Sequence, residues 1–499
     1  MEVPFTASLQ TLLPALLASF FAYHLIRRIY IAFFGSLSEI PGPLLCKFTG
    51  GPDAYQAIIA GRRSEWMHNL HLIYGPIVRV SPTLCSISDP AAVKDVYGGK
   101  FPKSKKRYQG KVFEGKEHLL MFSDPSAVKE RRGLMLPLFQ RSNLEGFAEE
   151  MQNITSQLLV QMENEQQIDG SVDVFRWLRL AAFDIIGLVA YGIDMEMTAT
   201  GKVSNLVEVM AQVFVSWISK DFIPFIDKIQ DTRLVPQLTA LRRAEQKFVG
   251  FGYSILKNML DKGQITENDR KNNLLKSLYR ASLKNPKLTM DLVATEAGSI
   301  LIAGSDTTST AMTYACFELS KRADLQQRLR EELKLVMEDI TSWPSFKGLE
   351  SLPLFNAFLK EVLRLWPTLP GPLERSVSKD GAVVAGYFLP EGTEVTMQAY
   401  SIHRDQSIYP EPLAFKPERW LQETSEMRNA YLPFSYGPRS CAGMNLAWYE
   451  MRFVMGVLIR RFELVPHPST NDETMAPVEH FFVVPRDMKC RVQLKAIDA

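Results

Sequence analysis

The ten residues from Phe434 to Gly443, FSYGPRSCAG, constrain this chain more than any other part of its sequence. Of the five cysteines, only Cys441 has a phenylalanine, an arginine and two glycines at short fixed offsets. A metal-bound thiolate needs backbone N–H groups turned toward its sulfur, and Gly437 and Gly443 allow such a close backbone. Arg439 offers a charge-assisted partner to an anionic group, and Phe434 can shield the sulfur from water. The string therefore predicts a thiolate-ligated centre.

The pattern F-x-x-G-x-R-x-C-x-G resembles the signature of the cytochrome P-450 family of haem-thiolate monooxygenases. The resemblance covers roughly residues 40 to 495. It implies haem b (iron protoporphyrin IX) as the cofactor and Cys441 as the axial ligand of its iron. It also implies a mainly α fold with small β-sheets. The alternative interpretation of the string is a buried free cysteine in a glycine-rich turn.

The amino terminus predicts a membrane anchor. Residues 4 to 26 contain no Asp, Glu, Lys or Arg, and Arg27 and Arg28 follow at once. That length spans the hydrocarbon core of a bilayer. Because the basic pair follows the span, the positive-inside rule places the rest of the chain in the cytosol. The alternative is a cleaved secretory peptide, which would need a basic leader, whereas the leader here carries only Glu2.

The rest of the chain predicts one mostly helical body with two small sheets. We expect residues 1–34 to form the anchor, 35–45 a Pro/Gly hinge, and 46–499 a single haem-thiolate domain. Strand patterns occupy 76–88 and 381–398, and the segment VEHFFVVP near the carboxyl end is strand-like. Helical periodicity covers 144–165, 173–192, 240–262, 290–321, 323–339 and 354–365.

Composition excludes several classes of protein. The 57 Lys and Arg residues against 55 Asp and Glu give a net charge of +2, which offers no argument for a nucleic-acid partner. The cysteines are odd in number and dispersed, without a C-x-x-C pair, so we expect a reducing, cytosolic setting. The seven histidines are scattered, without the spacing of a non-haem metal site.

A polar cluster interrupts the long apolar segment 297–319. A carboxylate and hydroxyls in such a run are costly unless something uses them, although a threonine can bond to the carbonyl four residues earlier. In the family that the chain resembles, this is the oxygen-side helix. The resemblance implies that Ala303 and Gly304 keep the backbone low over the haem. It makes Asp306 and Thr307 the catalytic pair that relays protons for O–O cleavage.

Two spaced motifs predict a structural cluster of charges. Glu361 and Arg364 form an E-x-x-R pair, which alone is weak because such pairs occur on many solvated helix faces. Arg419 lies in the segment PERW, 22 residues before Cys441. The resemblance implies a buried triad of Glu361, Arg364 and Arg419 that holds the haem-binding region in place.

Three arginines are candidates for binding the haem propionates: Arg132, Arg375 and Arg439. Arg375 follows the segment PGPLE, where the family has such an arginine, and Arg132 lies in VKERRGLMLPLF. That second segment resembles a helix that carries an aromatic residue or a histidine four residues before its arginine. This chain has Val128 there. One usual donor is therefore missing, and we give the three arginines more weight.

The resemblance also implies partners. We find no flavin, dinucleotide or Fe–S motif, so electrons are expected from NADPH through a separate reductase, with cytochrome b5 as a second candidate donor. Lys129 and Arg131 are candidate docking residues for an acidic reductase. The substrates are O2 and a lipophilic small molecule. The expected location is the endoplasmic reticulum membrane, with a single span and a cytosolic catalytic domain.

The substrate itself is not readable from the sequence. The segment VDVFRWLRLAAFDIIGLVAYG resembles fungal members that tailor secondary metabolites such as terpenoids and polyketides. Two alternatives keep the haem: an isomerase or dehydratase of the same fold, and a haem-binding protein without turnover. Candidate pocket residues, each of which could equally be an ordinary core side chain, are Phe113, Phe214, Ile300, Leu369 and Phe481.

Overall fold

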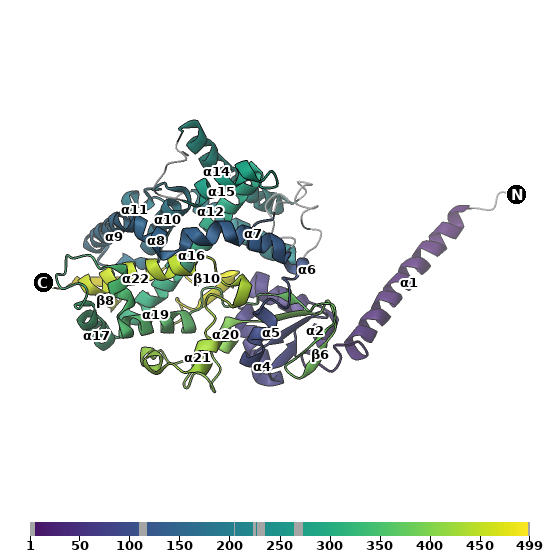
Figure 1. The fold of residues 1–499 in the computed structure, drawn as a ribbon. Helices are drawn as coiled ribbons and strands as arrows, with labels where there is room; N and C mark the ends of the chain where they lie inside the picture. The colour runs from purple at the N-terminus through teal and green to yellow at the C-terminus, as the bar shows by residue number, and fades with distance from the viewer. Residues whose placement is uncertain are drawn as a thin grey trace.

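The computed structural model describes residues 5–108, 117–203, 205–222, 226, 235–263 and 273–497, without the side chains of 5–12, 205–208, 211, 214 and 221. A mostly helical body holds several small sheets, and a single helix, α1, projects from it (Figure 1). The mainly α fold with small sheets and an apolar amino-terminal helix is confirmed.

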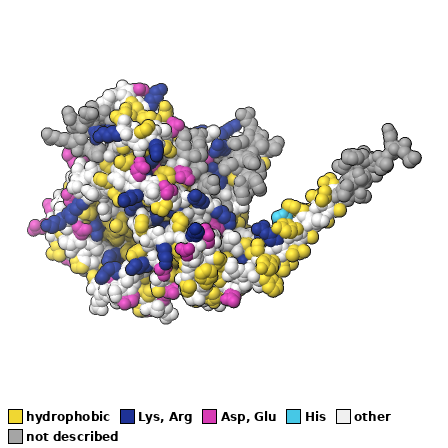
Figure 2. All heavy atoms as spheres, turned by 45° about the vertical axis from the view of Figure 1, so that its right-hand side comes forward, with side chains coloured by type: hydrophobic (Ala, Val, Ile, Leu, Met, Phe, Trp, Pro, Cys, Tyr) yellow, Lys and Arg dark blue, Asp and Glu magenta, His cyan; other side chains and the backbone are white. Residues whose placement is uncertain are grey.

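Helix α1 spans Phe5–Phe33. Within the described residues it is the one helix long and apolar enough to cross a membrane, over Leu13–Phe33. Only 6% of that apolar window is buried against the body, and Figure 2 shows hydrophobic side chains along the helix. Such a surface is costly in water and stable in lipid. Pro14 lies inside the helix and does not end it.

The end of α1 is tied to the body through one buried arginine. Arg79 is 0% exposed and its guanidinium donates to the carbonyls of Ile31, Ala32 and Leu37 at 3.2, 3.4 and 3.1 Å. Its backbone N–H donates to the Pro41 carbonyl at 2.7 Å. The segment expected to act as a hinge is therefore hydrogen-bonded to the first sheet.

Two helices form the centre of the body: α10 (Val174–Tyr191) and α16 (Met290–Ser320). Almost every residue of α10 is buried, as expected for a helix that is apolar on all sides. The close approach of the two helices depends on Gly304, because a Cβ there would lie 2.6 Å from the Cδ1 of Ile186.

The other helices surround this pair. They are α2 (Leu44–Phe48), α3 (Gly51–Tyr55), α4 (Arg63–Tyr74), α5 (Val93–Tyr97), α6 (Lys105–Tyr108), α7 (Pro125–Met135), α8 (Arg141–Leu144), α9 (Ala148–Asp169), α11 (Met197–Thr200), α12 (Asn205–Phe222), α14 (Pro236–Asp261), α15 (Leu274–Lys284), α17 (Ala323–Leu333), α18 (Phe346–Glu350), α19 (Pro353–Leu365), α20 (Ala399–Ile402), α21 (Ser425–Ala430) and α22 (Met444–Arg461).

The largest sheet has the order β1-β2-β7-β4. Strands β1 (Ile77–Arg79) and β2 (Leu84–Ile87) form the predicted antiparallel hairpin, and β7 (Glu394–Met397) pairs with β2 in parallel. The smaller sheets are β3-β11-β8, β5-β6 and β9-β10. Their strands are β3 (Val172–Asp173), β4 (Arg375–Ser376), β5 (Ala382–Val384), β6 (Tyr387–Leu389), β8 (Phe462–Pro466), β9 (Pro477–His480), β10 (Phe482–Pro485) and β11 (Arg491–Ala496).

Two details of the predicted fold were wrong. The described residues form four sheets rather than two, because β3 pairs with β11 across more than 300 residues and leaves no local pattern. The helix expected over 323–339 ends at Leu333. The apolar residues beyond it continue the periodicity, but Leu335 is 78% exposed and only Met337 of that tail is fully buried.

Candidate active site

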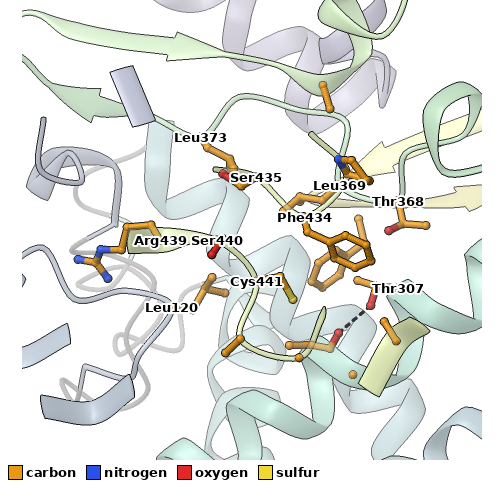
Figure 3. Close-up of a pocket in the computed structure, with 18 of the residues that line it drawn as sticks. Leu120, Thr307, Thr368, Leu369, Leu373, Phe434, Ser435, Arg439, Ser440 and Cys441 are labelled. Atoms are coloured by element: carbon orange, nitrogen blue, oxygen red, sulfur yellow. Dashed lines mark hydrogen bonds between the residues drawn. The ribbon is translucent and has the colours of Figure 1, made fainter. Parts of the chain in front are cut away.

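A cavity lies between α16 and the loop that precedes α22. The space open to the centre of a water molecule is about 260 Å³, and most of the lining side chains are apolar. Cys441 lies between Arg439 on one side and Thr307 on the other (Figure 3). The lining extends from Tyr97 to Phe482, so residues more than 300 positions apart in the sequence share one pocket.

The cysteine loop holds its thiol toward the cavity. The Cys441 N–H donates to the Phe434 carbonyl at 2.9 Å, which closes the loop, and Phe434 also lines the pocket. Burial raises the pKa of the Cys441 thiol, while the Gly443 N–H that donates to the sulfur, and Arg132, both lower it. The surrounding protein desolvates the thiol, but its surface is open to the cavity. These contacts suit a thiolate that gains a cationic partner.

The two glycines of the loop differ. Gly437 has φ +73°, and a Cβ there would lie 2.3 Å from the carbonyl oxygen of Tyr97, so only glycine fits. An added Cβ at Gly443 would meet no described protein atom within 4 Å. Gly443 precedes α22 and lines the cavity. A group bound in the cavity, and not the described protein, would therefore be what restricts a side chain at this position.

Three arginines line the cavity without an acidic partner. Arg132 donates to the Ser440 carbonyl at 2.7 Å, Arg375 to the Leu373 and Glu374 carbonyls at 3.1 Å, and Arg439 to the Phe122 carbonyl. Among the described residues, no carboxylate lies within ion-pairing distance of any of these arginines, and no Asp or Glu lines the cavity. Burial, with Arg375 and Arg132 nearby, lowers the pKa of Arg439 to about 10.

Two neighbouring residues of the polar cluster on α16, Asp306 and Thr307, lie in different surroundings. The Thr307 hydroxyl lines the cavity and donates to the Ala303 carbonyl at 2.8 Å, the local bond that a helical threonine often makes. Asp306 does not line the cavity. Its carboxylate accepts from Arg179 of α10 at 2.6 and 3.2 Å. Sequence reasoning missed Arg179, whose one signal is a charge within the apolar pattern of α10.

The sequence profile of the cytochrome P450 family matches residues 54–490. The chain belongs to the cytochrome P450 family. Its relatives include cytochrome P450 monooxygenase tazI of Aspergillus terreus, 28% identical over 94% of this chain and 96% of the relative. They also include cypX of Dothistroma septosporum, 29% identical over 96% and 95%, and tryprostatin B 6-hydroxylase of Neosartorya fischeri, 27% identical over 91% and 81%.

The cavity of this P450 fits a haem. The group carries two propionate carboxylates and an iron that accepts a thiolate. The cavity offers cations that, within the described part of the chain, donate to carbonyl oxygens, and a thiol that two neighbours favour as the anion. Ala303 and Gly304 both line the cavity, and a Cβ at Gly304 would also collide with Ile186 of α10.

The structure of this P450 brings the three residues of the predicted charged cluster together. Glu361 accepts from Arg364 at 2.8 Å through both oxygens and from Arg419 at 3.1 Å. The Glu361 and Arg364 side chains are 0% exposed. Trp420 and the Lys416 N–H also donate to Glu361 at 2.9 Å. The carboxylate is therefore fully paired, as a buried charge requires.

His403 connects this cluster to the cysteine loop. Its Nδ1 is 3.0 Å from the Arg364 carbonyl oxygen, and its Nε2 accepts from the Leu432 N–H at 2.8 Å. Burial, with Arg364 nearby, lowers the pKa of His403 to about 3, so the ring is neutral. A neutral ring both donates and accepts, which these two contacts need.

Of the predicted substrate-pocket residues, Ile300, Leu369 and Phe481 line the cavity. Phe113 and the side chain of Phe214 lie outside the described residues. Phe481 has φ +73°, a left-handed conformation at the turn between β9 and β10. Backbone strain of this kind is retained where the surrounding structure uses it, here to direct an aromatic ring into the pocket.

One of the two residues predicted for reductase docking is unsuitable. Arg131 is 9% exposed, and its guanidinium is paired with the buried carboxylate of Glu296 at 2.7 Å. The prediction that it meets a partner protein was therefore wrong, because the residue is committed inside the fold. Lys129, two residues earlier on α7, is exposed.

Proposed function

We propose that this P450 is an NADPH- and O2-dependent monooxygenase that inserts one oxygen atom into a lipophilic organic substrate. The observation that carries the proposal is the apolar cavity with the Cys441 thiol and the Thr307 hydroxyl on its lining. The apolar lining favours an apolar substrate. The isomerase and the non-catalytic alternatives would have no use for Asp306 beside Thr307.

Cys441, Arg132, Arg375 and Arg439 would hold the haem, the first through iron and the others through the propionates. A thiolate-bound haem supplies the one-electron and O2 chemistry of the reaction. The Gly443 N–H tempers the charge on the sulfur, and Phe434 covers it. Arg132 lies close to both the sulfur and the Ser440 carbonyl, so it orients the loop as well.

Proton delivery would begin at two side chains that are both hydrogen-bonded to other groups of the protein in this structure. Thr307 donates to Ala303, and must release that carbonyl before its single O–H serves the cavity. Asp306 is held by Arg179 on the side away from the cavity. After it leaves Arg179, the Asp306 carboxylate would take up a proton from solvent and pass it to the Thr307 oxygen, while the Thr307 hydroxyl gives its own proton to the cavity.

The reaction would belong to fungal secondary metabolism. Support comes from relatives named as fungal monooxygenases, among them one named as the 6-hydroxylase of tryprostatin B. Hydroxylation or epoxidation of a terpenoid or polyketide scaffold fits the apolar residues Ile300, Leu369 and Phe481.

Electrons would come from NADPH through a separate membrane-bound reductase, with cytochrome b5 as a second donor. A surface hollow lies behind the cysteine loop and shares Phe434 with the main cavity. Its lining includes the indole of Trp448 and two cations, Lys360 and Arg452, which are paired with Glu423 at 3.1 Å and Glu350 at 3.4 Å. Both pairs are partly exposed, unlike that of Arg131 with the buried Glu296. We propose this hollow as the docking site of an acidic reductase, in place of Arg131.

The proposed location is the endoplasmic reticulum membrane, with α1 as a single span and the body in the cytosol. Deletion of residues 1–28 should release much of the protein from membranes and leave the haem spectrum unchanged. A full-length protein that is soluble or secreted would contradict this placement.

A spectrum and a turnover assay test the function. The reduced carbon monoxide complex of the wild type should show the red-shifted Soret band of thiolate ligation, and Cys441→Ser should lose it. Oxygenated product should form only with NADPH, a reductase and O2. A band at the position of a histidine-ligated haem would contradict the proposal, as would turnover without NADPH.

A further inference from the structure

The apolar wall of the cavity contains a hydroxyl that the fold does not use. Thr368 is 9% exposed and lines the cavity beside Leu369. Its carbonyl accepts from the Val483 N–H at 3.1 Å, but within the described part of the chain its side-chain oxygen has no hydrogen-bond partner. Removal of a hydroxyl from water without a new hydrogen bond is unfavourable, so a partner from outside the protein would stabilise it.

The other hydroxyls on the lining differ from that of Thr368 in partner or in position. Ser299 and Thr307 donate to carbonyls of their own helix, α16, at 2.9 and 2.8 Å. The Tyr97 hydroxyl donates to the Met397 carbonyl at 2.6 Å. Figure 3 shows the serines of the cysteine loop on the opposite side of Cys441 from Thr307 and Thr368. A second free hydroxyl, that of Thr308, is distinguished by experiment below.

The backbone around Thr368 is held on both sides. Two residues earlier, the Trp366 ring stacks on Tyr314 with the ring centroids 4.6 Å apart and the planes at 8°. Two residues later, the Pro370 carbonyl accepts from the Tyr400 N–H at 3.3 Å. The Thr368 hydroxyl therefore has a fixed position. A preorganised group of this kind loses little conformational freedom when a ligand binds.

Apolar side chains surround this hydroxyl. The bond to Val483 joins Thr368 to β10, and Phe481 and Phe482 at the start of that strand line the cavity. Leu369 and Ile300 add to the same lining. Apolar walls hold a hydrocarbon skeleton, whereas a small number of polar groups fix its orientation. A valine would fill the same space as Thr368 without burying a hydroxyl.

We propose that Thr368 determines substrate specificity by donating a hydrogen bond to an oxygen atom of the substrate. The inference rests on the proposed monooxygenase function and narrows its substrate class. The substrate is a lipophilic scaffold that already carries a carbonyl or hydroxyl oxygen, and not a bare hydrocarbon. A threonine hydroxyl has one donor and two acceptor positions, so both kinds of oxygen suit it. A site built to hydrogen-bond an oxygen discriminates against the analogue that lacks it.

The test compares oxygenated probes with hydrocarbons of nearly the same shape: 2-adamantanone with adamantane, and cedrol with cedrane. Dissociation constants are measured from the change in the Soret band of the full-length ferric holoprotein. The wild type should bind the oxygenated member of each pair more tightly. Thr368→Val should weaken that binding about fivefold, which corresponds to a neutral hydrogen bond of about 1 kcal/mol. It should leave the binding of the hydrocarbons unchanged.

Three further variants give the result its meaning. Thr368→Ser keeps the hydroxyl and should keep the preference. Thr310→Val is the matched control, because Thr310 is buried on α16 outside the cavity lining and its hydroxyl has no partner among the described residues. Thr308→Val removes the other free hydroxyl on the lining and should also leave the preference unchanged.

Three outcomes would overturn the proposal. Equal weakening of both members of a pair in Thr368→Val would mean that the residue only packs against the ligand. Loss of the preference in Thr308→Val alone would assign the oxygen contact to α16. A wild type without a preference, including one whose spectrum changes with none of the probes, would remove the basis for the contact. The proposed function fails separately, through a reduced carbon monoxide complex that lacks the Soret band of thiolate ligation.

Discussion

Two groups of cations, one around Glu361 and one at the cavity, differ in what opposes their charge. Arg364 and Arg419 share the carboxylate of Glu361, and carbonyl oxygens take their remaining N–H groups. Arg375 and Arg439, at the cavity, donate to carbonyl oxygens alone among the described residues. The first group contains a carboxylate, which two arginines share, whereas the described part of the second group contains none.

The difference teaches how to separate structural from ligand-binding charges. A buried charge costs several kcal/mol unless an opposite charge and hydrogen bonds compensate for it. The Glu361 cluster has its own counter-charge, which reduces the formal charge of its two arginines to +1. The cavity cations retain an excess of positive charge that an anionic ligand would neutralise. The following predictions test this distinction, from the largest expected effect to the smallest.

Glu361→Gln should be the most damaging substitution, because it leaves Arg364 buried without its counter-charge. Loss of one partner of a buried pair typically costs about 3 to 5 kcal/mol. Denaturant unfolding of the haem-loaded protein measures this loss. Glu331→Gln removes the exposed pair with Lys334 and is the control, for which we expect no measurable change. Equal effects of the two substitutions would refute the distinction.

Thr307→Ala and Asp306→Asn should reduce the product formed per NADPH while haem content stays the same. A positioned proton donor commonly contributes about 10²- to 10⁴-fold, and we expect the lower end because water can replace it in part. NADPH consumed, hydrogen peroxide released and product formed are measured in one reaction. Thr308→Val, on the adjacent cavity-lining residue, is the control. Unchanged coupling in Thr307→Ala would mean that its hydroxyl serves only the bond to Ala303.

The neutral ring of His403 should make stability depend on pH. Its folded pKa of about 3 lies below the ordinary value near 6.5, so the unfolded chain binds the extra proton first as pH falls. The contribution is fully present above about pH 6.5 and is lost toward pH 3, by up to about 1.4 kcal/mol per pH unit. His403→Gln should flatten this slope between pH 7 and 5, measured by denaturant unfolding. His467→Gln, at a partly exposed histidine, is the control and should leave the slope unchanged.

Arg439→Gln should act in opposite directions on the two forms of the protein. Without haem, removal of a charge that burial disfavours most, and Arg375 and Arg132 disfavour further, should stabilise the chain by about 1 kcal/mol, since one pKa unit corresponds to about 1.4 kcal/mol. With haem, the same change removes a propionate partner and should destabilise it. Unfolding curves of the two forms test the sign. Destabilisation of both forms would mean that Arg439 is structural.

The parts of the site that local motifs encode could be predicted from the sequence. The loop around Cys441 and the spacing of Glu361, Arg364 and Arg419 were readable, because each motif stays close to one element of the fold. The pairing of Asp306 with Arg179 was not, since α10 and α16 are separated by about a hundred residues. The bond between the Thr368 carbonyl and the Val483 N–H was hidden for the same reason. Periodicity located helices but could not end α17, because the apolar pattern continues beyond it.

Arg79 fixes the last turn of α1 to the body, so the helix is attached rigidly and not through a flexible link. The hydrogen bonds to Ile31, Ala32 and Leu37 join the helix region to the body at several points. A single bond would let the helix rotate relative to the body. If α1 spans a bilayer, the tilt of the helix determines the orientation of the body relative to the membrane surface. A thicker or thinner membrane would then change the orientation of the whole enzyme. Arg79→Met would uncouple that orientation from membrane thickness.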